Sequence, residues 1–116
     1  MATLIPTGLC GAASSDVSDQ AVSDQVVRIG LLLDLSGPLA YISGEGNIVA
    51  ARMAVEDFGG KVLGYPIDVV VADHRNVAYV AAEQASAWFD AGNVDALMDV
   101  TATPAALAVA RIAKRK

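Results

Sequence analysis

The sequence predicts an α/β protein in which three β–α units form one open, parallel sheet. Three short apolar runs are predicted to be strands, and the first of them, over residues 26–34, is β-branched and aliphatic without alternation, which is typical of a strand that is buried on both faces. A stretch with apolar residues at helical spacing follows each run. Parallel neighbours need a long connection, and a crossover helix over one face of the sheet provides it.

The first unit begins with a strand over residues 26–34, whose sequence is VVRIGLLLD. A loop over residues 35–46 follows, and it contains glycine, serine and tyrosine side chains. The next helix ends at Gly59 and Gly60, because glycine is favoured where a helix stops. The predicted buried face of this helix consists of Ile48, Ala51, Val55 and Phe58.

The second unit has a strand over residues 66–73, with the sequence PIDVVVAD, and a helix that stops at Gly92. We interpret the preceding residues 59–66, GGKVLGYP, as a loop. Trp88 and its neighbour Phe89 are predicted to pack in the core rather than to form a ligand platform. The predicted buried face of the helix consists of Ala78, Ala82, Ala85 and Phe89.

The third unit has a strand over residues 94–100, with the sequence VDALMDV, and a helix that begins at Thr103 and Pro104. Threonine accepts hydrogen bonds from the free amides of a first helical turn, and proline is tolerated there because its missing N–H would be idle. Basic residues gather in the last turn, where they suit the negative end of the helix dipole; they are Arg111, Lys114, Arg115 and Lys116.

Composition limits the function classes. The chain has 116 residues, of which 54% are hydrophobic, so a sizeable core is expected for one small domain. The formal net charge of −5 offers no basic face to nucleic acid. No apolar run approaches the roughly 20 residues that a membrane span requires.

The N-terminal residues predict a secretory origin. Residues 1–13 carry no charge and give way abruptly to polar residues, as at the end of a signal peptide, and residues 14–25 are predicted to be a flexible segment. Gly11 and Ala13 fit the small residues before a cleavage point, although the positively charged start of a leader is missing. An ordinary flexible N-terminus is the alternative. A chain cleaved after Ala13 would lack Cys10, its only cysteine, and hence any disulfide or thiolate nucleophile.

The predicted ligand site lies beyond the carboxyl ends of the strands, where open parallel sheets bind ligands. Three loops leave the sheet there, over residues 35–46, 74–77 and 101–103. The helix that begins at Thr103 gathers free N–H groups and partial positive charge, which suits a carboxylate. The alternative is that Thr103 only caps its own helix. In the first loop Tyr41 supplies an aromatic face, while the glycines do not match a phosphate-binding motif.

Three blocks of the sequence resemble the Leu/Ile/Val-type periplasmic solute-binding proteins of ABC transporters: IGLLLDLSGPLAY, AVEDFGGKVLGYPIDVVVADH and WFD. The resemblance begins at about Val26 and continues to the last residue of the sequence. It implies a secreted protein with a Rossmann-like lobe on each side of a cleft. It also implies that residues 26–116 form only the N-terminal part of the first lobe.

The same resemblance implies a function and a site. The protein would be periplasmic and would deliver an amino acid or a related small organic acid to the membrane permease of an ABC transporter, with no cofactor, no metal and no catalysis. The missing second lobe commonly supplies the acid for an α-ammonium group. A one-residue shift in the first loop leaves open whether Tyr41 or Ile42 faces the ligand. The implied ligand-binding residues are Tyr41, Thr101, Ala102 and Thr103.

Two alternatives remain open at this point. The same fold serves as the ligand-sensing domain of receptors and regulators. The aspartates at the strand ends could instead bind a divalent cation or accept a phosphoryl group, as in a receiver-like domain; they are Asp34, Asp73 and Asp99. Against the receiver-like alternative, the first strand ends in a single acid rather than a pair. Asp34 itself is interpreted as structural rather than ligand-binding. His74 offers a base without a nucleophile beside it, and a lone histidine there is typically solvated or capping.

Overall fold

The computed structural model describes residues 25–116, which fold into an open sheet with helices on both faces. The expectations for residues 1–13, including Cys10 and the leader, and for the segment 14–25 up to residue 24 lie outside the described residues. The strands are β1 (Val27–Leu33), β2 (Lys61–Val62), β3 (Tyr65–Asp73) and β4 (Ala96–Met98). The helices are α2 (Ala40–Ser43), α3 (Glu45–Asp57), α4 (Ala78–Asp90) and α5 (Thr103–Ala113).

The sheet confirms the predicted α/β class with parallel β–α units. Its strand order is β2-β3-β1-β4, and β1 pairs in parallel with both β3 and β4. The register between β1 and β3 runs from the pair Val27 and Ile67 to the pair Leu33 and Asp73. Because β1 has a partner on each side, its residues from Gly30 to Leu33 are buried, as the unbroken apolar run predicted.

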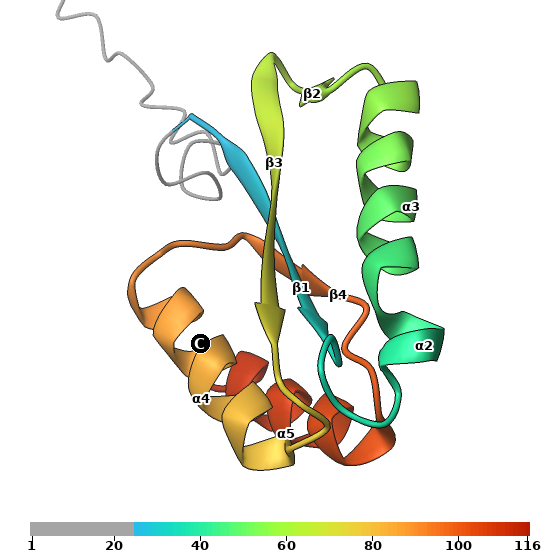
Figure 1. Cartoon of the computed structure of the whole chain (residues 1–116). Helices are drawn as coiled ribbons and strands as arrows, with labels where there is room; N and C mark the ends of the chain where they lie inside the picture. Colours follow the sequence, from blue (N-terminus) through green and yellow to red (C-terminus); the bar gives the residue numbers. More distant parts are fainter. Residues whose placement is uncertain (1–24) are drawn as a thin grey trace, which may run out of the picture.

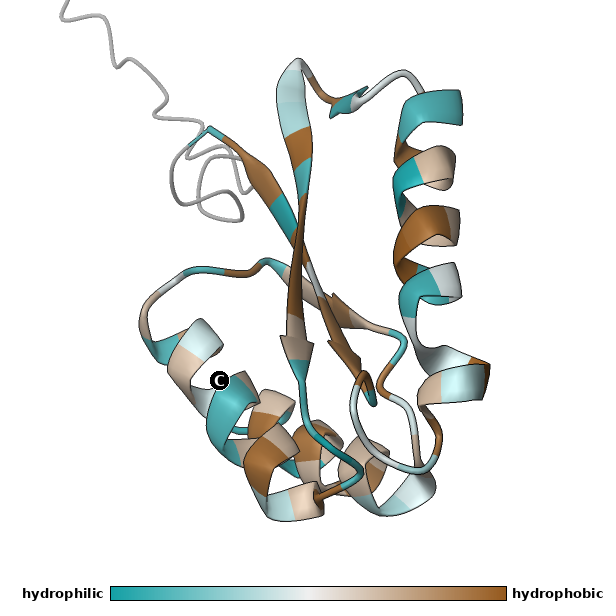
Figure 2. Ribbon diagram, viewed as in Figure 1, coloured by the Kyte–Doolittle hydropathy of each residue, from teal (hydrophilic) through white to brown (hydrophobic). Residues whose placement is uncertain are grey.

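The helices cover the two faces of the sheet unequally. Figure 1 shows α3 on one side of the strands, and α4 and α5 together on the other. Figure 2 shows that much of β1 and β3 is hydrophobic, with a few hydrophilic positions between the hydrophobic ones. On the α4 and α5 face, Leu32 packs with Ala81, Ala85, Ala105 and Val109, and the predicted core residues Trp88 and Phe89 pack against them. On the α3 face the buried cluster is smaller and consists of Leu31, Leu33 and Ile48.

Three elements differ from the sequence-based expectation. Residues 59–66 were expected to form a loop, but β2 makes a short antiparallel pair with the start of β3. The four-residue helix α2 lies inside the predicted first loop, and α3 begins at Glu45. The strand predicted over residues 94–100 is shorter, since only Ala96–Met98 pairs with β1.

Among the described residues, no helix has the length and hydropathy needed to cross a bilayer.

Candidate functional site

Three loops meet at the carboxyl edge of the sheet. Because β1, β3 and β4 are parallel, their carboxyl ends lie at the same edge, and the connections to α2, α4 and α5 leave from it (Figure 1). This is the edge at which the sequence predicted a ligand site. Asp73 contacts the first two of these loops, whereas no side chain caps the helix that follows the third.

The β1–α2 loop is held by two carboxylates. Asp34 is fully buried, and its two oxygens accept the backbone N–H groups of Gly37 at 2.6 Å and Leu39 at 2.8 Å. Asp73, at the end of the neighbouring strand, accepts the backbone N–H of Leu35 at 3.0 Å and the hydroxyl of Ser36 at 2.5 Å. The sequence-based interpretation of Asp34 as structural is confirmed, whereas the role of Asp73 was missed.

The environment of Asp73 favours its ionised form. Burial raises the pKa of this carboxyl, but hydrogen bonds from the Ser36 hydroxyl and from the backbone N–H groups of Leu35 and Arg75 lower it by more. The net effect holds the pKa of Asp73 below its ordinary value of 3.8. The side chain is therefore a charged acceptor at neutral pH, which strengthens its hydrogen bonds to the loop.

The β3–α4 loop is a tight turn with two left-handed residues. Arg75 and Asn76 have φ angles of 53° and 58°, a conformation that costs energy for residues other than glycine. The carboxylate of Asp73 accepts the N–H of Arg75 at 2.9 Å, and Nδ1 of His74 accepts the N–H of Asn76 at 3.1 Å. Of the two expected roles, solvated or capping, the solvated one is wrong because His74 is completely buried, whereas its ring nitrogen does accept a backbone N–H of the turn.

The β4–α5 loop corrects the predicted helix cap. The helix α5 begins at Thr103, as expected, but the residue at its N-cap position is Ala102, with a φ of 70°, and no side chain makes a capping hydrogen bond. Thr103 is exposed and lies one position inside the helix, so it does not cap α5 in the predicted way. The first N–H groups of α5 therefore lie outside the helical ladder with no side chain to accept them.

The other predicted site residues differ in exposure. Tyr41 and Ile42 lie on α2 and are both exposed, at 84% and 61%, so the choice between them stays open. Thr101 is partly buried, and its Oγ1 is buried without a hydrogen-bond partner among the described residues. Ala102 packs against the core cluster that α4 and α5 share. Thr101, Ala102 and Thr103 are consecutive at the start of α5, while Tyr41 lies on α2, in a different connection.

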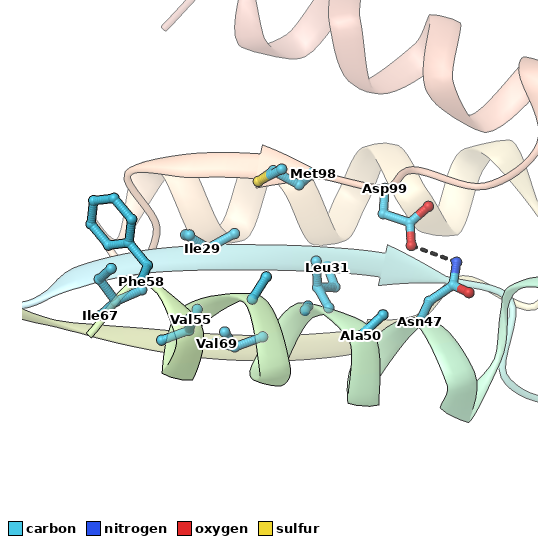
Figure 3. A pocket seen from close by; sticks show the side chains of 12 residues that line it. Ile29, Leu31, Asn47, Ala50, Val55, Phe58, Ile67, Val69, Met98 and Asp99 are labelled. Atoms are coloured by element: carbon cyan, nitrogen blue, oxygen red, sulfur yellow. Dashed lines mark hydrogen bonds between the residues drawn. The ribbon is translucent and has the colours of Figure 1, made fainter. Parts of the chain in front are cut away.

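A separate apolar groove lies between α3 and the sheet. Its volume is about 520 Å³, and Figure 3 shows side chains of α3 facing those of the strands across it. Its polar residues, Asn47 and Asp99, are hydrogen-bonded to each other at 2.6 Å. None of the predicted ligand-binding residues lines the groove, whose apolar wall includes Ile29, Leu31, Val55, Phe58, Ile67, Val69 and Met98.

The strand-end aspartates do not form a cation site. Within residues 25–116, no group of three His, Cys, Asp or Glu side chains is arranged to hold a metal ion. Asp34 and Asp73 accept hydrogen bonds from the β1–α2 loop, and Asp99 accepts one from Asn47. The arrangement required by the receiver-like alternative is therefore not present in this part of the chain.

Comparison with known proteins identifies the fold. The family model of periplasmic binding proteins matches residues 26–116. No curated protein sequence matches the chain. Among solved structures, a periplasmic binding protein from Burkholderia mallei is 46% identical over 78% of this chain and 24% of its own, with a TM-score of 0.75.

Two further structures are similar. One is a branched-chain amino acid ABC transporter periplasmic ligand-binding protein from Burkholderia xenovorans, 40% identical over 77% of this chain and 24% of its own, with a TM-score of 0.73. The other is an ABC transporter solute-binding protein from Rhodopseudomonas palustris in complex with benzoate, 28% identical over 78% of this chain and 25% of its own, with a TM-score of 0.69.

The chain spans about a quarter of the length of these solved structures. The alignment with the Burkholderia mallei protein nevertheless covers 78% of this chain, and the family model matches residues 26–116. The resemblance inferred from the sequence blocks is thereby confirmed. Since the family model covers most of the chain, the protein belongs to the periplasmic binding proteins.

Proposed function

We propose that this chain forms the first wall of a ligand-binding cleft in an extracytoplasmic protein that delivers a small carboxylate to an ABC transporter. The ligand class is an amino acid or a related organic acid. Family membership supports the transport role and the location outside the cytoplasm, and the similar proteins include one named for branched-chain amino acids and one in complex with benzoate. Both kinds of ligand carry a carboxylate, which is the group that this wall would bind.

One observation carries the proposal, namely the uncapped start of α5. Its first N–H groups have no side-chain acceptor, and the exposed Thr103 beside them is not used as a cap. Free N–H groups and the positive end of the helix dipole stabilise an anion at such a position. In this proposal the ligand carboxylate takes the place of a cap, and the hydroxyl of Thr103 donates to it.

The neighbouring residues complete the proposed wall. Ala102 brings the backbone close to the carboxylate without a large side chain. The hydroxyl of Thr101 points into the structure, so it would reach the ligand only after rotation about χ1, which is a fast motion between staggered conformers. Tyr41 or Ile42, both exposed on α2, would cover the apolar part of the ligand. The apolar groove beside α3 is not the proposed ligand site, because its lining is apolar except for Asn47 and Asp99, which are hydrogen-bonded to each other.

The experiment is calorimetric titration of the full-length protein, with both walls of the proposed cleft, with L-leucine and with benzoate. We expect saturable binding of one of them, and Thr103→Val should weaken it by about ten- to a hundredfold, because a charged group loses a donor. Thr103→Ser keeps the hydroxyl and should bind like the wild type. Ser86→Ala is the matched control, because it removes a hydroxyl that donates to Asp90 on α4 and has no part in the proposed site. Binding that Thr103→Val leaves unchanged would place the carboxylate elsewhere.

A further inference from the structure

We propose that Asp34 and Asp73 are positioning residues that fix α2, and with it Tyr41 and Ile42, as a rigid wall of the ligand cleft. This role rests on the proposed function, because it concerns the conformation of the wall that would contact the ligand. Neither carboxylate is proposed to touch the ligand. Both act through the backbone of the β1–α2 loop.

Asp34 acts from beneath the loop. It is fully buried, and its two oxygens each accept one backbone N–H, from Gly37 and from Leu39. A buried carboxylate with both oxygens engaged is costly to rearrange, since a released oxygen would lose its partner without gaining water. Gly37 lies so close to Asp34 that a Cβ on it would overlap the carboxylate. The loop therefore wraps around a fixed acceptor.

Asp73 acts from the neighbouring strand. Its carboxylate binds Leu35 and Ser36 at the start of the loop and Arg75 in the β3–α4 turn. One side chain thus ties two of the three site loops to each other. Because β1 and β3 pair in a fixed register, the start of the loop has one position relative to the sheet.

Gly37 and Leu39, whose N–H groups bind Asp34, also support α2 with their carbonyl groups. The carbonyl of Gly37 accepts the N–H of Ala40 at 3.2 Å. The carbonyl of Leu39 accepts the N–H of Ile42 at 2.9 Å and that of Ser43 at 3.0 Å. Gly37 and Leu39 therefore donate to Asp34 with their N–H groups and support α2 with their carbonyls. A shift of the carboxylate would be transmitted to the helix that carries Tyr41 and Ile42.

The proposal predicts a local effect that general destabilisation would not produce. Asp34→Asn keeps the size of the side chain but replaces one acceptor oxygen with a donor, so one of the two N–H groups loses its partner. Ser36→Ala removes the hydroxyl that binds Asp73, and Ser36→Thr retains it. Ser86→Ala is the matched control, since the Ser86 hydroxyl also donates to an aspartate, Asp90, at 3.1 Å.

The first measurement is hydrogen–deuterium exchange of the full-length chain, well below its melting temperature. In Asp34→Asn the amides of residues 37 and 39–43 should exchange about tenfold faster, while those of β1 and α4 keep their rates. Ser36→Ala should act in the same direction, and Ser36→Thr should restore slow exchange. Ser86→Ala should leave the loop unchanged. Unaltered exchange of the loop in Asp34→Asn, or an increase spread evenly over the chain, would overturn the positioning role.

The second measurement is the affinity for L-leucine and benzoate, determined by calorimetry on the same variants. Asp34→Asn and Ser36→Ala should weaken the binding of whichever probe the wild type binds, by about three- to tenfold, with Ser36→Thr restoring it. Altered exchange without altered affinity would overturn the link to the cleft. If the wild type bound neither probe, the proposed ligand class would fail, while the exchange measurement would still decide whether the carboxylates position α2.

Discussion

Gly37 and Gly46 differ in the space around their Cα atoms. A Cβ on Gly37 would overlap the carboxylate of Asp34, whereas a Cβ on Gly46, in the first turn of α3, would meet no atom within 4 Å. Gly37→Ala should therefore lower the free energy of unfolding by about 1–3 kcal/mol, because a buried contact is overpacked. Gly46→Ala should raise it by about 0.5 kcal/mol, because alanine favours helix. Denaturant unfolding of the two variants measures both changes, and equal effects would contradict this picture.

Asp73 should make the stability of the protein depend on pH in acid. Its pKa is lowered in the folded state, so its contribution is complete above the ordinary value of 3.8 and is lost as the pH falls through the folded value. Asp73→Asn should therefore be less stable than the wild type at neutral pH, and the difference should shrink below pH 3.8. Thermal unfolding over a pH series measures the difference.

Asp90 provides the control for that series. Lys116 and Ser86 lower its pKa through hydrogen bonds, but this carboxylate is exposed. Water and salt screen such a surface pair, so Asp90→Asn should change the melting temperature little at any pH. A larger effect at Asp90 than at Asp73 would contradict the importance assigned to the loop contacts.

Sequence reasoning at the level of single residues succeeded where the chemistry is local. The start of α5 at Thr103 and the structural role of Asp34 followed from residue type and position. The prediction of the cap was wrong because Ala102 adopts a left-handed conformation, which cannot be predicted from an alanine in the sequence. The burial of His74 and the bonds of Asp73 to Leu35 and Ser36 depend on strand pairing, so no residue nearby in the sequence signals them.

At the level of elements, the approach of α4 to β1 depends on Gly30. A Cβ there would lie 2.7 Å from Cδ2 of Leu97 and 2.9 Å from Cζ3 of Trp88. Gly30→Ala should therefore push α4 outward and cost about 1–3 kcal/mol. Since Trp88 is the only tryptophan in the sequence, its fluorescence emission should report the displacement directly.

A control for this prediction lies next to Trp88 on the same helix. Ala87 is exposed, so Ala87→Ser should leave the emission of Trp88 unchanged and cost only the small difference in helix propensity. An unchanged emission spectrum in Gly30→Ala would show that Leu97 alone moves aside to make room.

The periodicity of hydrophobic residues predicted the long strands and helices but not the short ones. The buried strands and the helices α3, α4 and α5 extend over enough residues for the pattern to be recognised. The two residues of β2 and the four of α2 are too few to display a period. Phe58 was assigned to the buried face of its helix but is 66% exposed, since it lies at the open end of the apolar groove.

At the level of the whole molecule, the described sheet has an uncovered edge at β4 and an apolar surface beside it. In the described structure β4 pairs only with β1, and Met98 is 55% exposed beside the apolar groove. Unpaired strand edges and apolar surfaces promote association. The 116 residues expressed alone should therefore self-associate with rising concentration, as sedimentation velocity would measure.

A charged variant tests which surface is responsible. Met98→Lys places a cation at the edge of β4 and over the groove, so it should shift the sedimentation profile toward the monomer. Glu83→Lys, on the exposed side of α4, is the control and should have no such effect. A monodisperse, cooperatively melting wild-type monomer would show that these residues fold stably by themselves despite the exposed edge of β4.

The bond between Ser36 and Asp73 also bears on how the chain selects one pairing of its strands. A slip of β3 by two residues along β1 would keep every apolar side chain on its own face, so hydrophobic burial discriminates weakly against it. Such a slip would move the Asp73 carboxylate by roughly 6.6 Å, beyond the reach of Ser36 and Leu35. Only the observed register, with Leu33 beside Asp73, satisfies both groups. The polar contacts that shape the loop thereby also make the misaligned sheets less stable than the native one.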